Sequence, residues 1–292
     1  MRSATSLLTL LSLTVGVLGG AVYDLDTSYV GTDFLDTWSF EAITDPTGGR
    51  VNYVDQATAL ADNLTYASGD TLIMRCDDTT VLTADGPGRN SVRIKSNAQY
   101  TTHVVVWFFY RIEGVNDVSP NTISLHVGST CSIPSSNSDQ TGTISATNCD
   151  VNTDGNSGCG VQNPTSNSYG PDFNSAGGGW YAMERTTSYI NVWFWTRDDS
   201  SVPSDVSSAA SSVDTSNWGT PVANFPNTDC DIGSVFGANN IIFDLTLCGD
   251  WAGVSSIYSD AGCPDTCVDY VNENPSAFSE AYWDVAGVYV YT

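Results

Sequence analysis

Residues 104–117 read VVVWFFYRIEGVND and combine a strand pattern with an acidic end. The first seven residues of the stretch are apolar without interruption. A short unbroken apolar run of this kind is typical of a buried strand. Three residues later comes Glu113, a single carboxylate followed by Gly-Val-Asn-Asp. The stretch therefore predicts a buried strand that ends close to one acidic side chain.

Further strand patterns are spread along the chain between turn residues. Clusters such as TADGPGRN and DPTGGR supply the Gly, Pro, Asn and Asp that turns require. Charged residues make up 14% of the chain, well below the usual share, whereas 8 Trp and 14 Tyr are present. This composition favours an all-β protein over one built from long amphipathic helices. The clearest predicted strands cover residues 91–96, 189–195, 240–247 and 287–292.

Two polar stretches have the composition of linkers but carry residues that indicate packing. Residues 131–179 are rich in Ser, Asn, Thr and Gly, yet contain three cysteines that would staple them to the surface. Residues 198–219 include Trp218, a side chain that favours burial. We expect both stretches to pack against the domain. A short helix is predicted over residues 270–278, ahead of the closing strand.

The first 20 residues have the build of a secretory signal, with an early Arg2, an apolar centre and small residues at the end. No later segment approaches the roughly 20 apolar residues that a membrane-spanning helix needs. We therefore expect a secreted, extracellular protein without a membrane span. Residues 1–20 would be the signal peptide, and residues 21–292 a single domain.

The charge balance limits the partners of the protein. Nine Lys and Arg against 33 Asp and Glu give a formal net charge of -24. Such a field repels nucleic acid and anionic membranes, so neither is expected as a partner. Neutral ligands fit better, and we expect a monomer.

The eight cysteines predict disulfide bonds rather than a metal cluster in a secreted chain. Their pairing stays open, because eight cysteines allow many connectivities. His103 and His126 are the two histidines, and Cys263-x-x-x-Cys267 is the nearest approach to ligand spacing, so a zinc site is disfavoured. No metal and no cofactor are expected. Asn63 begins a glycosylation sequon.

Carbohydrate chemistry suits this composition. The chain has no Gly-x-Ser-x-Gly elbow and no phosphate loop. A Ser-His-Asp site is disfavoured because only two histidines are present. Trp and Tyr rings offer flat apolar faces for sugars, and carboxylates carry out the acid/base steps of glycoside hydrolysis.

Several separated stretches resemble the fungal laminarinase-like endo-β-glucanases of glycoside hydrolase family 16. The resemblance implies a β-jelly-roll sandwich of two antiparallel sheets, of the concanavalin A-like lectin and glucanase type, with a concave substrate cleft. It also implies cleavage inside β-1,3 or mixed β-1,3/1,4 glucan chains with retention. The stretches include YVGTDFLDTWSF, DPTGGRVNYVDQATA, SVRIKSNAQYTTHVVVW, EGVNDVSPNTISLH, GGGWYAMERT, INVWFWTRDDSSVPSDV and WGTPVANFPNTDCDI through LCGDWAG.

Members of that family carry a Glu-x-Asp-x-x-Glu signature followed by Gly-Val-Asn-Asp or a similar tail. The first Glu is the nucleophile, the Asp orients it, and the last Glu is the acid/base. Residues 112–117 align with the end of this signature, so the resemblance assigns the acid/base role to Glu113. Counting back places Phe108 at the nucleophile position and Tyr110 at the Asp position. Neither side chain replaces a carboxylate in this family.

The resemblance also implies that a segment is missing ahead of Glu113. Relatives carry there a further stretch of strand, a Cys-Gly-Thr-Trp-Pro-Ala segment, a second Trp-bearing segment and the first two catalytic carboxylates. Its loss would fuse two strands and leave ladder groups unpaired. We hypothesise that the chain as written reflects a mispredicted or misspliced exon. Loss of the Cys in that segment would leave Cys76 or another cysteine without its partner.

Three further residues match positions that contact substrate in the resembling enzymes. Arg93 corresponds to a cleft arginine that binds glucose hydroxyls, His126 to a histidine near the cleaved bond, and Trp251 to an aromatic sugar platform. The alternatives are a surface strand arginine, a solvated or core histidine and a core tryptophan. Trp180 and Tyr181 stay open between the two interpretations.

The sequence thus predicts a glycoside hydrolase of the endo-1,3(4)-beta-glucanase type that acts on β-glucan. The chain as written is predicted to be inactive, because the nucleophile and its Asp helper are absent. A catalytically dead β-glucan-binding protein is the alternative. A structural wall protein is disfavoured by the absence of Ser/Thr-rich repeats. The preference between β-1,3 and mixed linkages stays open.

Overall fold

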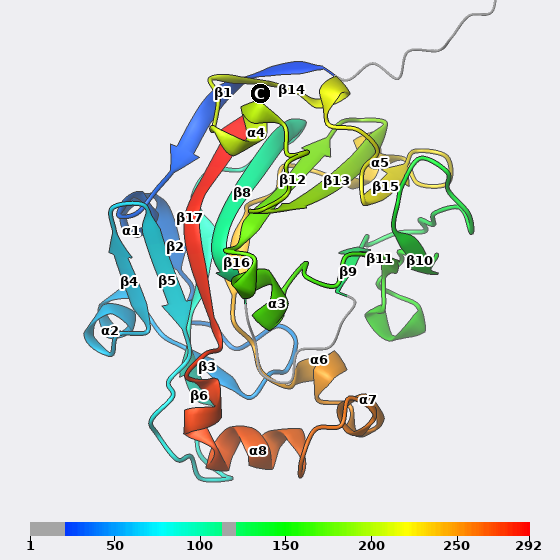
Figure 1. Cartoon of the computed structure of the whole chain (residues 1–292). Helices are drawn as coiled ribbons and strands as arrows, with labels where there is room; N and C mark the ends of the chain where they lie inside the picture. Colours follow the sequence, from blue (N-terminus) through cyan, green and yellow to red (C-terminus); the bar gives the residue numbers. More distant parts are fainter. Residues whose placement is uncertain (1–20, 113–120) are drawn as a thin grey trace, which may run out of the picture.

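The computed structural model describes residues 21–112 and 121–292, so Glu113 lies outside the described residues (Figure 1). Strands dominate these ranges, and their longest helix has 7 residues, which confirms the all-β prediction. None of the helices described is long and apolar enough to cross a bilayer.

The largest sheet has nine antiparallel strands. Its central strands are β17 (Tyr282–Tyr291) and β8 (His103–Ile112), which lie side by side in Figure 1. The order is β14-β1-β17-β8-β12-β13-β15, with β5 pairing the other half of β17 and β4 pairing β5. The remaining strands are β14 (Ser212–Asp214), β1 (Val22–Tyr29), β12 (Gly179–Arg185), β13 (Tyr189–Thr196), β15 (Ala223–Pro226), β5 (Thr71–Arg75) and β4 (Thr65–Ser68).

Three smaller sheets accompany it. Two are antiparallel with three strands each, in the orders β10-β11-β9 and β16-β7-β2, and the third is the parallel pair β3-β6. Their strands are β10 (Thr143–Ala146), β11 (Cys159–Gln162), β9 (Thr122–Leu125), β16 (Ile242–Asp244), β7 (Arg93–Ser96), β2 (Trp38–Phe40), β3 (Val51–Tyr53) and β6 (Arg89–Ser91).

The helices are short and lie in the connections. In Figure 1, α6, α7 and α8 lie together below the sheets. The helices are α1 (Asp33–Thr37), α2 (Gln56–Ala61), η1 (Asp154–Asn156), α3 (Gly170–Ser175), α4 (Ser204–Ser207), η2 (Thr215–Asn217), α5 (Ile232–Val235), α6 (Gly249–Ala252), α7 (Ser255–Asp260), α8 (Cys267–Glu273) and η3 (Pro275–Phe278).

The unbroken apolar run of β8 is explained by burial on both faces of the large sheet. Val105 and Phe109 belong to the core between the sheets. Val104 and Val106 belong to a second apolar cluster on the opposite face, together with Trp218. Since side chains alternate along a strand, both faces of β8 need apolar residues.

The core between the large sheet and the smaller sheets has two parts. One part joins the large sheet to β2, β7 and β16 and includes Trp38, Ile94 and Phe243. The other joins β13 and β15 to β9 and β11 and includes Leu125 and Val161. The two small antiparallel sheets therefore cover different regions of the same large sheet.

Most of the predicted elements are present, with shifted ends. The strand predicted over residues 189–195 is β13, and residues 287–292 fall at the end of β17. The strand predicted over residues 240–247 is shorter, because β16 ends at Asp244. The helix predicted over residues 270–278 begins earlier, at Cys267, and Pro275 divides it into α8 and η3.

Both linker-like stretches pack against the domain, as predicted. Disulfides Cys131–Cys230 and Cys149–Cys159 hold the first stretch. In the second stretch, Trp218 is buried against Trp193. The two rings meet at right angles with their centroids 5.1 Å apart, so this loop forms a lid over the outer face of the large sheet.

Candidate functional site

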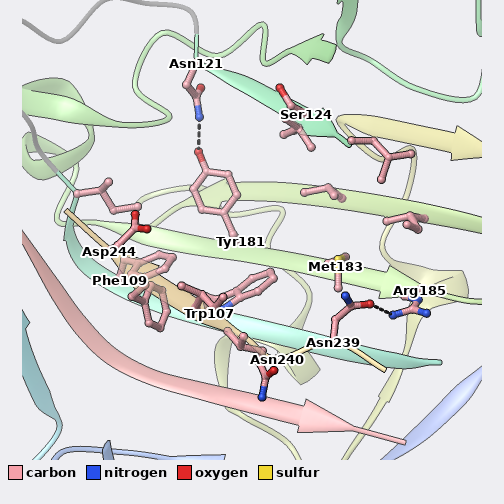
Figure 2. A pocket seen from close by; sticks show the side chains of 18 of the residues that line it. Trp107, Phe109, Asn121, Ser124, Tyr181, Met183, Arg185, Asn239, Asn240 and Asp244 are labelled. Carbon is pink, nitrogen blue, oxygen red and sulfur yellow. Dashed lines mark hydrogen bonds between the residues drawn. The ribbon is translucent and has the colours of Figure 1, made fainter. Parts of the chain in front are cut away.

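A cavity of about 590 Å³ lies between the large sheet and the two three-stranded sheets. Its lining comes from β8, β12 and β17 on one side and from the neighbourhood of β9 and β16 on the other. Figure 2 shows Trp107, Phe109, Tyr181 and Met183 pointing into it, with Asn121 and Ser124 opposite. Residues that line it also include Ile112, Ile123, Leu125, Phe243, Asp244 and Trp283.

Polar side chains fix two sides of this cavity. The Tyr181 hydroxyl accepts from Asn121 Nδ2 at 3.1 Å (Figure 2). It donates to the Ser168 carbonyl at 2.6 Å. Arg185 Nη1 donates to Asn239 Oδ1 at 2.8 Å (Figure 2). These bonds tie the large sheet to the loops that border the cavity. The Tyr181 and Arg185 side chains at the cavity are therefore held in place by hydrogen bonds.

The two signature positions ahead of Glu113 lie on the face of the large sheet that points away from the cavity. Trp107 and Phe109 line the cavity, and alternation places Phe108 and Tyr110 on the opposite face of the sheet. There Phe108 packs on Tyr289 with ring centroids 4.8 Å apart. Tyr110 is 40% exposed and donates to Asp70 Oδ2 at 3.0 Å. Neither side chain therefore faces this cavity.

Arg93 lies in a charged cluster on β7. Its Nε donates to Glu41 Oε2 at 3.0 Å and its Nη1 donates to Asp244 Oδ2. Lys95, two residues further along the same strand face, donates to the other oxygen of Glu41. Ile94 between them points into the core, so Arg93 and Lys95 lie on the opposite face of the sheet, and Asp244 reaches Arg93 from β16 at the border of the cavity. The sugar-binding role of Arg93 stays a prediction, and two carboxylates hold its guanidinium in place.

The two carboxylates of this cluster have opposite pKa shifts. Burial raises the pKa of Asp244 and outweighs the charge and hydrogen bond of Arg93. Burial acts in the same direction on Glu41, but hydrogen bonds from Lys95 and Arg93 outweigh it and lower the Glu41 pKa. Glu41 is therefore held ionised, while Asp244 takes up a proton more easily. These two partners of Arg93 were not recognised from the sequence, because they lie 52 and 151 residues away along the chain.

His126 directly follows β9 and is not among the residues that line the cavity. Its Nδ1 is 3.0 Å from Asn156 Oδ1. The imidazole packs on Gly158, where a Cβ atom would lie 2.6 Å from the ring and where a φ of +70° favours glycine. His126 is exposed, and its role near the cleaved bond stays a prediction.

Trp251 is 74% exposed on α6, which excludes the core alternative for this side chain. It borders a second cavity of about 590 Å³ that is also lined by Leu247, Tyr258, Tyr270 and Phe278. An exposed indole beside an apolar hollow is a suitable surface for stacking against a sugar ring. Trp180, in contrast, is buried and packs against Phe108 and the Arg197 guanidinium.

Six of the eight cysteines form disulfides, so the disulfide prediction is confirmed for them. The third bond, Cys248–Cys267, joins α8 to the residue just before α6. Cys76 and Cys263 are free thiols. Cys76 is fully buried, and burial raises its pKa to about 12. Within the described ranges no group of three His, Cys, Asp or Glu residues is arranged to hold a metal ion.

Asp45 organises the loop that faces α6. Its Oδ2 accepts from Gly49 N at 2.8 Å, from Thr47 Oγ1 at 2.8 Å and from Thr246 Oγ1 at 2.6 Å. Gly49 is required at its position, because a Cβ there would lie 2.3 Å from Asp45 Oδ2. Burial raises the Asp45 pKa, but these hydrogen bonds outweigh burial and lower it below its ordinary value.

The substitution Asp45→Asn is expected to lower the free energy of unfolding at pH 7 by about 1–3 kcal/mol, because charge-assisted hydrogen bonds are lost. The Asp45 pKa is lower in the folded state than in the unfolded state. Its contribution is therefore complete above the unfolded pKa of about 4 and is lost as the pH falls through the folded value. Urea unfolding of both proteins at pH 7 and pH 3 measures this difference. An equal difference at both pH values would contradict the role of the ionised carboxylate.

Comparison with known proteins identifies relatives of this chain. The sequence model described as the XgeA-like, catalytic GH16 domain matches residues 38–111 and 111–291. A probable glycosidase of Schizosaccharomyces pombe is 38% identical, and the match covers 92% of this chain and 69% of that protein. A probable endo-1,3(4)-beta-glucanase of Neosartorya fischeri is 37% identical, and the match covers 92% of this chain and 45% of that protein. The chain thus spans about half the length of the Neosartorya relative.

Two solved structures are similar over nearly the whole chain. GH16 Laminarinase 16A from Phanerochaete chrysosporium, with 6-O-glucosyl-laminaritriose in donor and acceptor sites, has a TM-score of 0.91 and 56% identity. The match covers 93% of this chain and 100% of that chain. An elongating GH family 16 beta-1,3-glucosyltransferase has a TM-score of 0.85 and 35% identity, with 92% and 100% coverage. The laminarinase-type jelly-roll prediction is confirmed by these matches.

The family match is divided at Arg111, the penultimate residue of β8. The alignment with the Schizosaccharomyces protein runs over 298 positions, whereas 92% of 292 residues is about 269 residues. About 29 aligned positions of that relative therefore have no counterpart in this chain. From the family match, the similarity at both levels and the shared sandwich, it follows that this chain belongs to glycoside hydrolase family 16.

Proposed function

We propose that the gene encodes a secreted, endo-acting β-glucan hydrolase that cleaves β-1,3 or mixed β-1,3/1,4 bonds with retention. The observation that carries the proposal is the similarity to Laminarinase 16A over 93% of this chain at 56% identity. That enzyme is described with β-glucan oligosaccharides in its donor and acceptor sites. This chain also contains an apolar strand followed by EGVND, residues 113–117, which resembles the end of the family signature.

We further propose that the chain as written does not hydrolyse glucan. Retention requires two carboxyl groups about 5 to 5.5 Å apart, one as nucleophile and one as acid/base. Glu113 takes the acid/base role, and Phe108 and Tyr110 occupy the positions of the nucleophile and its Asp helper. The division of the family match at Arg111 supports the loss of a segment that carries both carboxylates.

The whole protein is proposed to be a secreted monomer. Residues 1–20 are a secretion signal, and residues 21–292 form one domain that acts as a monomer without metal or cofactor. Arg93, His126 and Trp251 contact the glucan, with Arg93 held by Glu41 and Asp244. The three disulfides agree with an extracellular protein. Reducing-end release from laminarin tests the activity: none is expected from the chain as written, and release is expected once the segment is restored.

A second function, β-glucan binding without hydrolysis, is favoured by the exposed Trp251 indole. If the chain as written retains its aromatic surface, it is expected to bind insoluble β-1,3-glucan without releasing reducing ends. Retention of the protein on the glucan together with background hydrolysis would support this function for the chain as written.

The substitution Trp251→Ala is expected to weaken glucan binding about tenfold, because stacking of an aromatic ring on a ligand contributes on the order of 1–1.5 kcal/mol. Thermal stability should not change, since the side chain is 74% exposed. Tyr66→Ala is the matched control, because Tyr66 is an exposed aromatic residue on β4, at the edge of the large sheet. Affinity electrophoresis in laminarin measures both variants. Equal retardation of the two would remove Trp251 from the binding surface.

A further inference from the structure

We propose that Asp244 is a positioning residue for Arg93, and that glucan binding weakens when the Asp244 carboxylate takes up a proton. This role rests on the proposed function, in which Arg93 contacts glucan. While it is charged, Asp244 holds the Arg93 guanidinium in one orientation. Asp244 thereby acts on the bound glucan through another side chain and gives the binding a dependence on pH.

The strand register brings Asp244 and Arg93 together. β16 and β7 are antiparallel, and Asp244 lies directly opposite Arg93 in their ladder. Residues that are directly opposite in such a ladder carry their side chains on the same face. Phe243 and Ile94, which form the next pair, belong to the core. Asp244 and Arg93 therefore share the face of this sheet that points away from the core.

The backbone of Asp244 is held from two sides. Trp283 Nε1 donates to the Asp244 carbonyl at 3.1 Å, which ties β16 to β17 of the large sheet. The next residue, Leu245, donates its backbone N–H to Val92 O at 3.2 Å. The Asp244 carboxylate therefore reaches Arg93 from a fixed point.

The guanidinium of Arg93 is shared between two carboxylates. Its Nε donates to Glu41 Oε2 at 3.0 Å, and its Nη1 donates to Asp244 Oδ2. Among the described residues none accepts a hydrogen bond from Nη2, so this nitrogen can donate to a glucan hydroxyl. Because a guanidinium is planar, two anchors fix the direction of the third nitrogen. The Asp244 side chain is 33% exposed, so protons reach it from solvent.

The surface beside this pair continues to the Trp251 indole. Thr246 follows Asp244 by two residues, and its Oγ1 donates to Asp45 Oδ2 at 2.6 Å. Thr246 also lines the second cavity together with Trp251. Ile242 precedes Asp244 on the same strand face and is 42% exposed. A glucan chain stacked on Trp251 can therefore extend to Arg93.

Asp244 is the group of this cluster that changes its charge in mildly acidic solution. Burial raises its pKa, as described above. Burial lowers the Arg93 pKa, but the hydrogen bonds and charges of Glu41 and Asp244 outweigh burial and raise it. The Glu41 and Asp45 pKa values are lowered, and burial raises the Tyr53 pKa. The titratable groups around Asp244 are Arg93 and Lys95 from β7, Glu41 beside β2, Asp45 from the adjoining loop and Tyr53 from β3.

Protonation of Asp244 weakens one of the two anchors of the guanidinium. A hydrogen bond between two charged groups is about twice as strong as one to a neutral acceptor. Once Asp244 is neutral, Glu41 alone holds Arg93 firmly, and the direction of Nη2 is no longer fixed. Ordering the side chain again on binding lowers the affinity for glucan. The expected loss is about threefold to tenfold, the effect of one hydrogen bond of ordinary strength.

Laminarin binding, followed by tryptophan fluorescence of the full chain at pH 7 and pH 4.5, tests this role. Binding is expected to be about threefold to tenfold weaker at pH 4.5. Asp244→Asn has the shape of the protonated carboxyl, so at both pH values it should bind as the unsubstituted chain binds at pH 4.5. Asp36→Asn removes the same charge from an exposed position on α1 and should keep the full pH dependence.

Two results of this titration overturn the proposal. One is an Asp244→Asn variant that retains the pH dependence of the unsubstituted chain. The other is laminarin binding by the unsubstituted chain that is equally strong at both pH values. Circular dichroism of the variants at each pH shows that they are folded, so that a loss of binding reports on the site.

A measurement without glucan separates this role from the proposed function. In the free chain, the ¹³C resonance of the Asp244 carboxyl and the Nε–H resonance of Arg93 should follow pH with the same midpoint. Asp244→Asn should remove that midpoint from Arg93. Different midpoints overturn the proposal whether or not glucan binds. A shared midpoint without laminarin binding at either pH keeps the coupling of Asp244 to Arg93 and contradicts the proposed glucan contact.

Discussion

Restoring the missing segment between Arg111 and Ile112 is expected to raise laminarin hydrolysis from background by a factor on the order of 10⁴–10⁶. This is the factor by which removal of a catalytic nucleophile or its helper slows a hydrolase. The restored chain would have the nucleophile, its Asp helper and Glu113 on one strand, where the chain as written has Phe108 and Tyr110 on the opposite face of β8. Reducing-end release from laminarin, with the anomeric configuration followed by NMR, measures rate and stereochemistry together.

The controls separate chemistry from folding. In the restored chain, Glu113→Gln should abolish hydrolysis of laminarin while leaving thermal unfolding unchanged, since the two side chains have the same shape. The same segment with Gln in place of its first signature Glu should fold equally well and be inactive. Hydrolysis of laminarin by the chain as written, at a rate near that of the restored chain, would disprove the role of the segment.

The substitution Arg89→Met is expected to lower the free energy of unfolding by about 3–5 kcal/mol, a large part of the roughly 5–15 kcal/mol of a typical domain. Arg89 is fully buried. Its Nη1 donates to Asp77 O at 2.8 Å and to Thr80 O at 3.1 Å, and its Nε donates to Val271 O at 3.2 Å. The guanidinium also lies 5.0 Å from the centre of the Phe278 ring. Methionine retains the apolar stem but leaves three carbonyls without these donors.

Arg50→Met is the matched control. Arg50 also bonds the neighbouring loop and α8, with donors to Gly86 O and Asn272 Oδ1, both at 2.9 Å. Its position is partly exposed, so water replaces the lost donors and the expected loss is about 1 kcal/mol. Urea unfolding at pH 7 measures both variants. Equal losses would show that burial does not control the energy of these arginine bonds.

Much of the fold follows from local sequence patterns. The run Tyr189–Thr196 forms a strand because β-branched and aromatic residues continue along it. The closing strand β17 ends in the predicted segment for the same reason. The end of α8 at Glu273 could not be predicted exactly from the sequence, because helix ends depend on capping and on the position of Pro275.

The candidate site was less accessible to sequence reasoning. The residues predicted to contact substrate were assigned by resemblance, and the structure puts Arg93 on the strand face opposite the core and Trp251 on an exposed helix. The partners Glu41 and Asp244 could not be found, because contacts between strands depend on register rather than on distance along the chain. The disulfide pairing was open for the same reason.

The sequence by itself determined the β architecture, the stapled loops, the family and the single carboxylate Glu113 at the end of an apolar run. Only the tertiary structure decided which face each residue of that run occupies, with Trp107 and Phe109 toward the cavity and Phe108 and Tyr110 away from it. It also decided that β9 and β16 border the same cavity. A strand pattern specifies alternation, but the partner on each side is set by segments far away in the chain.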